Sequence, residues 1–408
     1  MWFASYSYFE REHWPITLSI EWKNTKMVDE KILIPTDDLA RFLDRYSLGR
    51  DRGKNSKNFL RMKVHRGALT SSQLRGLAEL SETYGKSYAE LTDRQDIQLH
   101  WIDQTQSLEI FSRLERLGFT TDFCGQAFPK AGRGDLRNIT VCPLAGLNPK
   151  ELIDPASLTN EIREFFTGNK EFLDLPRKFK ITISSCDECC TRPVVNDLSL
   201  ITVQNRNCEK GYALYVGGSL GKSEPGPILA QSLGVFTSAE NAFEVILALV
   251  KVFKKQGNRE IKSKARFKWL VQTKGVKKIR ELLENQLGRR LEDYSPNKPL
   301  SGPKEHSRIQ KQKNKKYYLN IPVANGILSA DQLKNIAELS ETYGTGDVRL
   351  TPWQNIILIN IPHEKINAVR GRLYKIGLPL YQAPLRWIAI GCASNFCGLT
   401  QEPHAKTT

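Results

Sequence analysis

The stretch AELSETYG occupies residues 78–85 and occurs again, letter for letter, at residues 337–344. The copies lie 259 positions apart (337 minus 78), and the same offset relates further identical residues from Gly67 through Gly118, with no insertion or deletion. Solenoid proteins repeat every ~20–50 residues, so an interval this long indicates two similar halves instead. We therefore predict two α+β units related by pseudo-twofold symmetry.

The pattern within the first copy alternates between helix and strand. Apolar residues between positions 74 and 80 follow helical spacing, and Gly85 ends this predicted helix. Residues 97–101 alternate apolar and polar side chains, which predicts a half-buried strand. A further helix is predicted from about residue 106 to 117. Because the second copy repeats this order, it is expected to fold in the same way.

Composition and charge restrict the function classes. The chain has 408 residues and a formal net charge of +16, so nucleic acid, an acidic protein, an anionic substrate or a carboxylate-rich cofactor would be attracted to it. It contains no recognisable nucleic-acid recognition module. No apolar run reaches the ~18 residues of a membrane span and no signal-peptide pattern is present, so we expect a cytoplasmic protein. Eight cysteines in such a chain favour reduced thiols over a disulfide framework.

A basic stretch lies between the two copies. Residues 133–147 read RGDLRNITVCPLAGL, and residues 175–193 read LPRKFKITISSCDECCTRP. Arginines and lysines stand here beside glycines and cysteines, which predicts a pocket for a poly-anionic ligand. Lys178 and Lys180 are two apart on a predicted strand, so their side chains share one face and can converge on one anion. An exposed basic strand face is the alternative.

In their order, these motifs resemble those of the sirohaem-containing nitrite and sulfite reductases. The resemblance covers roughly residues 59–397. The motifs that carry it are FLRMK at 59–63, TDRQDIQLHW at 92–101, the two basic stretches, VGG at 216–218, and a second T-x-x-Q followed by a pair of cysteines.

The resemblance implies two ferredoxin-like repeats plus a sirohaem-binding α+β domain. Sirohaem and a 4Fe–4S cluster would be the cofactors, sulfite or nitrite the substrate, and an acidic donor such as ferredoxin or a reductase subunit the electron source. The implied division is an unclear N-terminal segment (1–57), a first ferredoxin-like repeat (58–125), a sirohaem- and substrate-binding domain (126–288), a linker (289–316), a second repeat (317–380) and the start of a cluster-binding domain (381–408).

Site residues follow from the matched motifs. The anion-binding quartet of the family corresponds to Arg61, Arg137, Lys178 and Lys180, where positive charge would hold the oxyanion and proton donors would help cleave its bonds. Lys180 favours sulfite, since plant-type nitrite reductases carry Asn at the matching position, although some nitrite reductases share the doubly basic form. Expected contacts to the carboxylates of sirohaem are Arg94, Gln98, His100, Arg133 and Asn138.

The cysteines depart from the family pattern. The family supplies four cluster thiolates as C-x5-C and C-x3-C. Here only Cys392 and Cys397 match, with the spacing C-x4-C, and we expect an incomplete copy of the family, whether fragment, split protein or frameshift. Cys142 and the run CDECC (Cys186, Cys189, Cys190) occupy the first-half positions that mirror the cluster ligands. Their spacing suits zinc or redox chemistry, with simple packing as the alternative.

Three functional hypotheses remain open from the sequence. The first is a sirohaem-dependent enzyme that reduces sulfite to sulfide, or nitrite to ammonia, by six electrons. The second is a non-catalytic tetrapyrrole- or metal-binding remnant of the same fold. The third is a basic nucleic-acid-binding protein.

Overall fold

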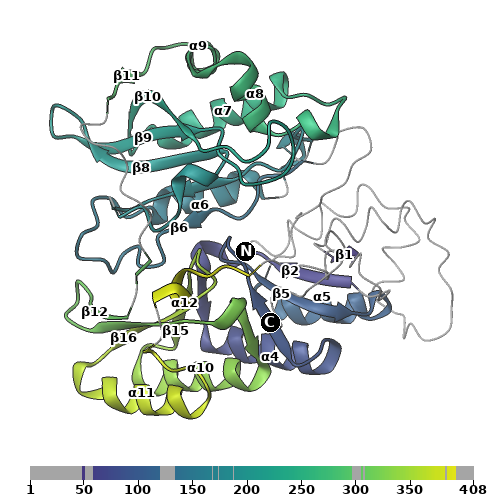
Figure 1. Cartoon of the computed structure of the whole chain (residues 1–408), viewed down its shortest axis with the longest axis vertical. Helices are drawn as coiled ribbons and strands as arrows, with labels where there is room; N and C mark the ends of the chain where they lie inside the picture. Colours follow the sequence, from purple (N-terminus) through teal and green to yellow (C-terminus); the bar gives the residue numbers. More distant parts are fainter. Residues whose placement is uncertain are drawn as a thin grey trace. The chain divides into compact units, whose positions relative to one another are not determined.

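The structure is a computed structural model that describes most of the chain after residue 57. The described residues are 48–50, 58–119, 134–167, 169–172, 174–186, 188–295, 305–306, 308–381 and 384–391. Arg133, Cys392 and Cys397 lie outside these ranges, as does most of the N-terminal segment. The described elements form three sheets (Figure 1).

The two sequence copies fold into equivalent elements. In each copy a threonine or serine begins the first helix with a capping box, in which the Thr70 or Ser329 hydroxyl accepts from the glutamine three residues on, and a glycine follows the helix end. The elements of the first copy are β2 (Asn58–Met62), β3 (Ala68–Thr70), α4 (Ser71–Tyr84), β4 (Tyr88–Leu91), β5 (Ile97–Ile102) and α5 (Ser107–Arg116). Those of the second are β13 (Tyr317–Ile321), β14 (Ile327–Ser329), α10 (Ala330–Tyr343), β15 (Asp347–Leu350), β16 (Ile356–Ile361) and α11 (Ile366–Lys375).

Each copy gives one short strand to the sheet of the other. One five-stranded sheet has the order β1-β2-β5-β4-β14, with β1 at Leu48–Arg50, and the other has the order β12-β13-β16-β15-β3, with β12 at Ile309–Lys311. Strand β14 pairs antiparallel with β4, and β3 pairs antiparallel with β15. Helices α4 and α10 lie side by side (Figure 1). The predicted pair of similar α+β units is confirmed, and the two units interlock.

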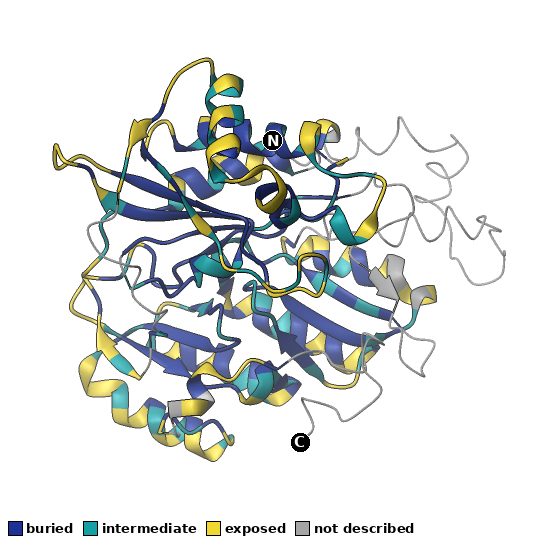
Figure 2. Ribbon diagram, turned by 45° about the horizontal axis from the view of Figure 1, so that its top comes forward, coloured by how far each residue is buried: buried dark blue, intermediate teal, exposed yellow. Residues whose placement is uncertain are grey.

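The residues between the copies build a third, six-stranded sheet. Its order is β11-β10-β9-β8-β7-β6, in which β6, β7 and β8 run parallel and the remaining pairs antiparallel. Its apolar side chains and those of its helices form one buried core, dark blue in Figure 2. The bounds are β6 (Thr140–Val141), α6 (Ala156–Phe166), β7 (Ile181–Ile183), β8 (Leu198–Gln204), β9 (Lys210–Val216), β10 (Gln231–Ser238), α7 (Ala242–Gln256), α8 (Phe267–Lys274), α9 (Val276–Leu287) and β11 (Glu292–Asp293).

Two local expectations differ from the structure. Ser238 before an apolar run has the sequence pattern of a helix N-cap, but helix α7 begins at Ala242 because β10 extends through Ser238. The Ser238 hydroxyl instead lies in the turn and accepts from the amide of Asn241. The stretch predicted as a linker contains β11 and β12, which pair with β10 and β13. No helix within the described residues is long and apolar enough to cross a membrane.

Candidate functional site

A tight turn between β4 and β5 places Arg94. The Thr92 hydroxyl accepts hydrogen bonds from the backbone amides of Arg94 at 3.2 Å and Asp96 at 3.0 Å, and Gln95 takes the left-handed conformation with φ of 59°. The Gln95 side chain donates to the carbonyl of Leu350 at 2.8 Å and accepts from the amide of Val141 at 2.9 Å. The motif T-x-x-Q therefore fixes the Arg94 turn against both the second copy and the central sheet.

The two lysines of the RKFK motif lie on an extended segment that enters β7. Phe179, between them, forms a parallel bridge with Leu136. The backbone amide of Lys180 donates to a carboxylate oxygen of Asp197 at 3.0 Å. That carboxylate is held in turn by the Arg266 guanidinium, at 3.0 and 3.1 Å from its two oxygens. A buried ion pair thus fixes the backbone at Lys180.

The surroundings of both lysines disfavour their charged forms. Burial and the positive charge of Arg94 lower the pKa of Lys180 to about 7. The negative charge of the Asp93 carboxylate acts in the opposite direction, toward a higher pKa. Burial and the charge of Arg137 lower the pKa of Lys178 well below its ordinary value. Within the described part of the chain neither ammonium group has a hydrogen-bond or ion-pair partner. An anion bound between the two ammonium groups would offset the free-energy cost of keeping them charged in these surroundings.

Asp93 and Arg192 belong to the same charged cluster and were missed by the sequence analysis. The Asp93 carboxylate lies 3.5 Å from the Arg94 guanidinium and 3.6 Å from that of Arg192, which also donates to the Asp93 carbonyl. Burial acts to raise the pKa of Asp93, but the charges of Arg94, Lys180 and Arg192 hold it below its usual value. The guanidinium of Arg192 also lies over the Trp353 ring, 5.3 Å from its centroid.

Arg61 and Arg137 complete the cluster. Arg61 faces Gln98 across β2 and β5, and its Nε donates to the Gln98 side-chain oxygen at 2.7 Å. Its charge acts on the Asp93 carboxylate. Arg137 is 3% exposed, and its Nε atom lies 3.5 Å from a carboxylate oxygen of Asp135. The structure therefore brings Arg61, Arg94, Arg137, Lys178 and Lys180 into one electrostatically coupled group.

Like Gln98, the expected cofactor contacts Asn138 and His100 bind protein groups. The amide nitrogen of Asn138 donates to the carbonyl of Val64 and to the carboxylate of Asp96, at 2.9 and 2.7 Å. His100 Nε2 lies 2.7 Å from the Glu90 carboxylate, and both side chains are buried. In the structure these two residues fix neighbouring strands and loops. Arg133 lies outside the described residues.

A cavity of about 220 Å³ lies beside part of this group. Its wall includes Lys63, His65, Asp135, Arg137 and Asn138. Lys178 and Lys180 do not line it. Its overlap with the predicted site is therefore limited to Arg137 and Asn138.

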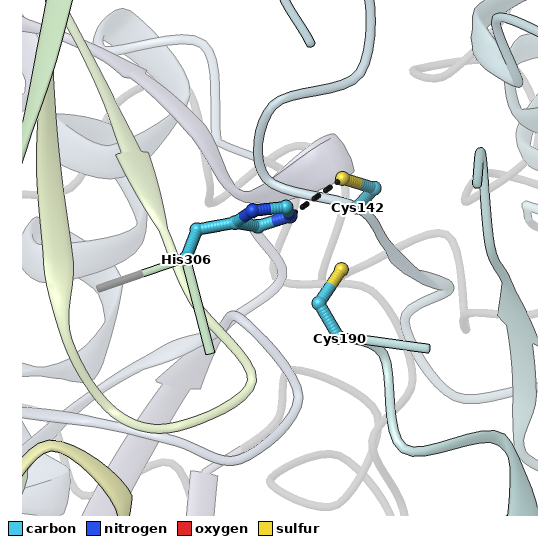
Figure 3. Close-up of side chains that lie close together, drawn as sticks. All are labelled: Cys142, Cys190 and His306. Carbon is cyan, nitrogen blue, oxygen red and sulfur yellow. Dashed lines mark hydrogen bonds between the residues drawn. The ribbon is translucent and has the colours of Figure 1, made fainter. Parts of the chain in front are cut away.

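The first-half cysteines gather at a second place. Cys142, Cys190 and His306 hold their sulfur and nitrogen atoms within 4.8 Å of one another, and Cys142 Sγ lies 3.3 Å from His306 Nε2 (Figure 3). Gln354 in the second copy binds both the amide and the carbonyl of Gly391, as Gln95 binds the amide of Val141. In the sequence Cys142 follows Val141 and Cys392 follows Gly391.

Comparison with known proteins decides the family. The sequence model described as the nitrite and sulphite reductase 4Fe-4S domain matches residues 132–291. The model described as the nitrite/sulfite reductase ferredoxin-like half domain matches residues 51–117 and 309–376. The chain belongs to the nitrite and sulfite reductase family. This confirms the resemblance drawn from the sequence motifs.

Relatives carry both activities in their names. The chain is 34% identical over 344 residues to sulfite reductase (ferredoxin) 2 of Mycolicibacterium paratuberculosis, covering 84% of this chain and 60% of the relative. It is 31% identical to the assimilatory ferredoxin-dependent nitrite reductase of Haloferax mediterranei, covering 81% and 60%. The structure of the NirA protein of Mycobacterium tuberculosis is similar with a TM-score of 0.83 at 27% identity, covering 95% of this chain and 72% of that one. The chain thus spans about 60% of the length of these curated relatives.

Proposed function

We propose that the chain forms the sirohaem- and substrate-binding part of a sulfite reductase. The observation that carries the proposal is the pair Lys178 and Lys180, which is partly buried and whose ammonium groups have no hydrogen-bond or ion-pair partner within the described residues. Burial without a partner is costly for an ammonium group, so such a pair suits an anion that completes the site. Arg61 and Arg137 would hold the same anion.

The donor set also fits sirohaem, which is rich in carboxylates. Guanidinium groups bind carboxylates strongly through paired hydrogen bonds, and Arg94 and Arg192 lie together in the cluster with Arg61. Arg94 would hold a carboxylate, and Gln98, His100, Arg133 and Asn138 are proposed to support the cofactor directly or through their neighbours. When bound, sirohaem supplies the iron to which the oxyanion binds and through which electrons arrive from a 4Fe–4S cluster, for which Cys392 and Cys397 are proposed ligands.

Lys180 is suited to transfer protons. With a pKa of about 7 it is present both as ammonium and as amine at neutral pH. A donor whose pKa lies near the working pH gives up its proton readily and regains it from solvent. The Lys180 Nζ–H would therefore protonate an oxygen of the substrate as the S–O bond breaks. The neighbouring Lys178 would contribute positive charge to the same anion site.

Sulfite is preferred over nitrite in this proposal. Sulfite carries more negative charge than nitrite at neutral pH, so a second lysine adds more to the binding of sulfite. The electron donor is proposed to be an acidic protein such as ferredoxin, because the chain carries a formal net charge of +16. The cytoplasmic location stays a prediction.

The binding of sulfite to the chain loaded with sirohaem tests the proposal. Sirohaem should bind and give visible absorption, and sulfite should shift that absorption with an affinity that Lys178→Ala and Lys180→Ala weaken by about tenfold or more, or roughly 1.4 kcal/mol. Lys277→Ala, an exposed lysine on α9, is the matched control and should leave the affinity unchanged. A chain that takes up no sirohaem, or lysine variants that bind sulfite like the control, would show that the function has been misassigned.

A further inference from the structure

Three buried side chains from distant parts of the chain meet at the cluster shown in Figure 3. Cys142 follows β6, Cys190 lies between β7 and β8, and His306 precedes β12. Cys142 and Cys190 are each 1% exposed and His306 is 5% exposed. The cluster therefore links the central sheet to the segment that enters the second copy.

The spacing of the donor atoms suits one metal ion. Zinc binds thiolate sulfur at about 2.3 Å and imidazole nitrogen at about 2.0 Å, which puts two donors of a tetrahedral site about 3.5–3.8 Å apart. Cys142 Sγ and His306 Nε2 are 3.3 Å apart, and all three donors lie within 4.8 Å of one another. An iron–sulfur cubane binds its four ligands at four different iron atoms, so it requires donors spread more widely than these.

Cys186 is the candidate for a fourth donor. It is 1% exposed and its thiol interacts with the Cys142 thiol. It stands outside the group of three donors that all lie within 4.8 Å of one another, so its side chain would turn toward the metal to complete the site. The amide nitrogen of Asn148 lies 3.6 Å from Cys186 Sγ and orients it. Three cysteines and one histidine form a common ligand set of closed, structural zinc sites.

The surroundings also match a metal site. The other ring nitrogen of His306, Nδ1, lies 3.7 Å from a carboxylate oxygen of Glu188, and a carboxylate in this position orients a metal-bound imidazole. Apolar side chains that pack beside Cys142 and Cys190 include Leu144, Tyr318 and Ile357. The buried carboxylate of Glu305 also acts on Cys190 and His306, so the surroundings combine apolar groups with a second carboxylate.

We propose that Cys142, Cys186, Cys190 and His306 bind one zinc ion, which fastens the central sheet to the second copy. Four protein ligands leave no open coordination position, so the role of the site is structural. It does not depend on the proposed reductase function. Cys189, adjacent in sequence and equally buried, is outside the ligand set, and so is the exposed Cys208.

Metal content and cobalt spectroscopy of the full chain test the site. We expect about one zinc per chain after purification without chelators, and, after replacement by cobalt, the visible bands of tetrahedral Co²⁺ with thiolate charge transfer. Cys142→Ser, Cys190→Ser and His306→Ala should each reduce zinc to near zero. Cys189→Ser and Cys208→Ser are the matched thiol controls and should keep it.

A second measurement, on the unaltered chain, tests the site even if the substituted variants fail to fold. In the unaltered chain, removal of zinc with a chelator should expose the three ligand thiols to a thiol reagent, and added zinc should protect them again. The proposal is overturned by a chain that holds no zinc, by a Cys142–Cys190 disulfide, or by zinc that persists in Cys142→Ser and His306→Ala. Iron with acid-labile sulfide that is lost in Cys142→Ser would equally overturn it, since a cluster would then occupy the site.

Discussion

Lys180 combines a partly buried side chain with a fixed backbone. Its amide is held by Asp197, while its side chain faces the charges of Arg94, Asp93 and Arg266. Burial is the largest cause of its lowered pKa, so the group resembles other lysines that exchange protons near neutral pH. The chemistry at this residue should therefore depend strongly on pH.

Sulfite binding should weaken as the pH rises through about 7. The Lys180 ammonium loses its proton there, and with it the charge that attracts the anion. In Lys180→Arg the side chain stays charged, so the affinity of that variant should change much less between pH 6 and pH 9. Titration of the sirohaem absorption with sulfite across this range measures the effect. An equal pH dependence in both proteins would assign the titration to another group.

The same lowered pKa affects the stability of the chain without its anion. Unfolded Lys180 keeps its proton up to its ordinary pKa of 10.5, whereas folded Lys180 loses it near 7, so the unfolded state binds more protons between these values. The contribution of Lys180 to stability must therefore rise with pH across this window. The melting temperature of Lys180→Met minus that of the unaltered chain should be a few degrees larger at pH 6 than at pH 9. A difference in melting temperature that does not change with pH would argue against the lowered pKa of Lys180.

Replacing Lys180 by asparagine tests substrate choice. In an active enzyme that contains this chain, Lys180→Asn should reduce sulfite turnover by about tenfold more than nitrite turnover, because the lost charge matters more for the more highly charged anion. Lys277→Asn serves as the control. Equal losses on both substrates would mean that Lys180 does not discriminate between them.

At the scale of single residues the sequence predicted the motif residues but not their partners. Arg94, Lys178 and Lys180 were found because they stand in recognisable motifs. Asp93 and Arg192 were missed, because their contact spans 99 positions and no local pattern joins them. The same is true of His306, which lies 164 positions from Cys142 and carries no spacing signal.

At the scale of elements the repeat predicted more than any single pattern could. The identities at one offset predicted two equivalent units, and the elements of both copies match position by position. The exchange of β3 and β14 was not predictable, since a three-residue strand carries too little pattern to say which sheet it joins. The start of α7 is also hard to place from sequence, because a serine before an apolar run has the pattern of a helix cap even when a strand continues through it.

The exchanged strands depend on two equivalent glycines. Gly67 and Gly326 have φ of 62° and 70°, and a Cβ on either would lie 2.8 Å from a backbone carbonyl oxygen of the other copy, at Leu350 and Leu91. Gly67→Ala and Gly326→Ala should each lower the free energy of unfolding by roughly 1–3 kcal/mol. Gly371→Ala, on a helix with open space around it, should instead be neutral or stabilising by ~0.5–1 kcal/mol. Urea denaturation measures all three, and unequal losses at the two equivalent glycines would contradict the symmetry argument.

At the scale of the molecule, Gln95 joins the three sheets. It lies on the first copy, donates to Leu350 on the second, and accepts from Val141 on the central sheet. Its counterpart Gln354 binds only Gly391 in this way. The pseudo-twofold symmetry is therefore broken where the central domain inserts, and the anion cluster and the cysteine cluster lie on parts of the chain that Gln95 fastens together.

Loss of the Gln95 side chain should lower the stability of the whole molecule. In Gln95→Ala the buried carbonyl of Leu350 and amide of Val141 lose their partners, and each such loss costs ~1–3 kcal/mol. We expect a total loss of about 2–6 kcal/mol in the free energy of unfolding and, because the Arg94 turn is no longer fixed, weaker sulfite binding as well. Gln73→Ala, which removes the capping-box partner of Thr70 at the edge of the same copy, should cost only ~1 kcal/mol and leave sulfite binding intact. Chemical denaturation and sulfite titration of the two variants measure this difference, and comparable results for both would show that Gln95 has no special part in holding the three sheets together.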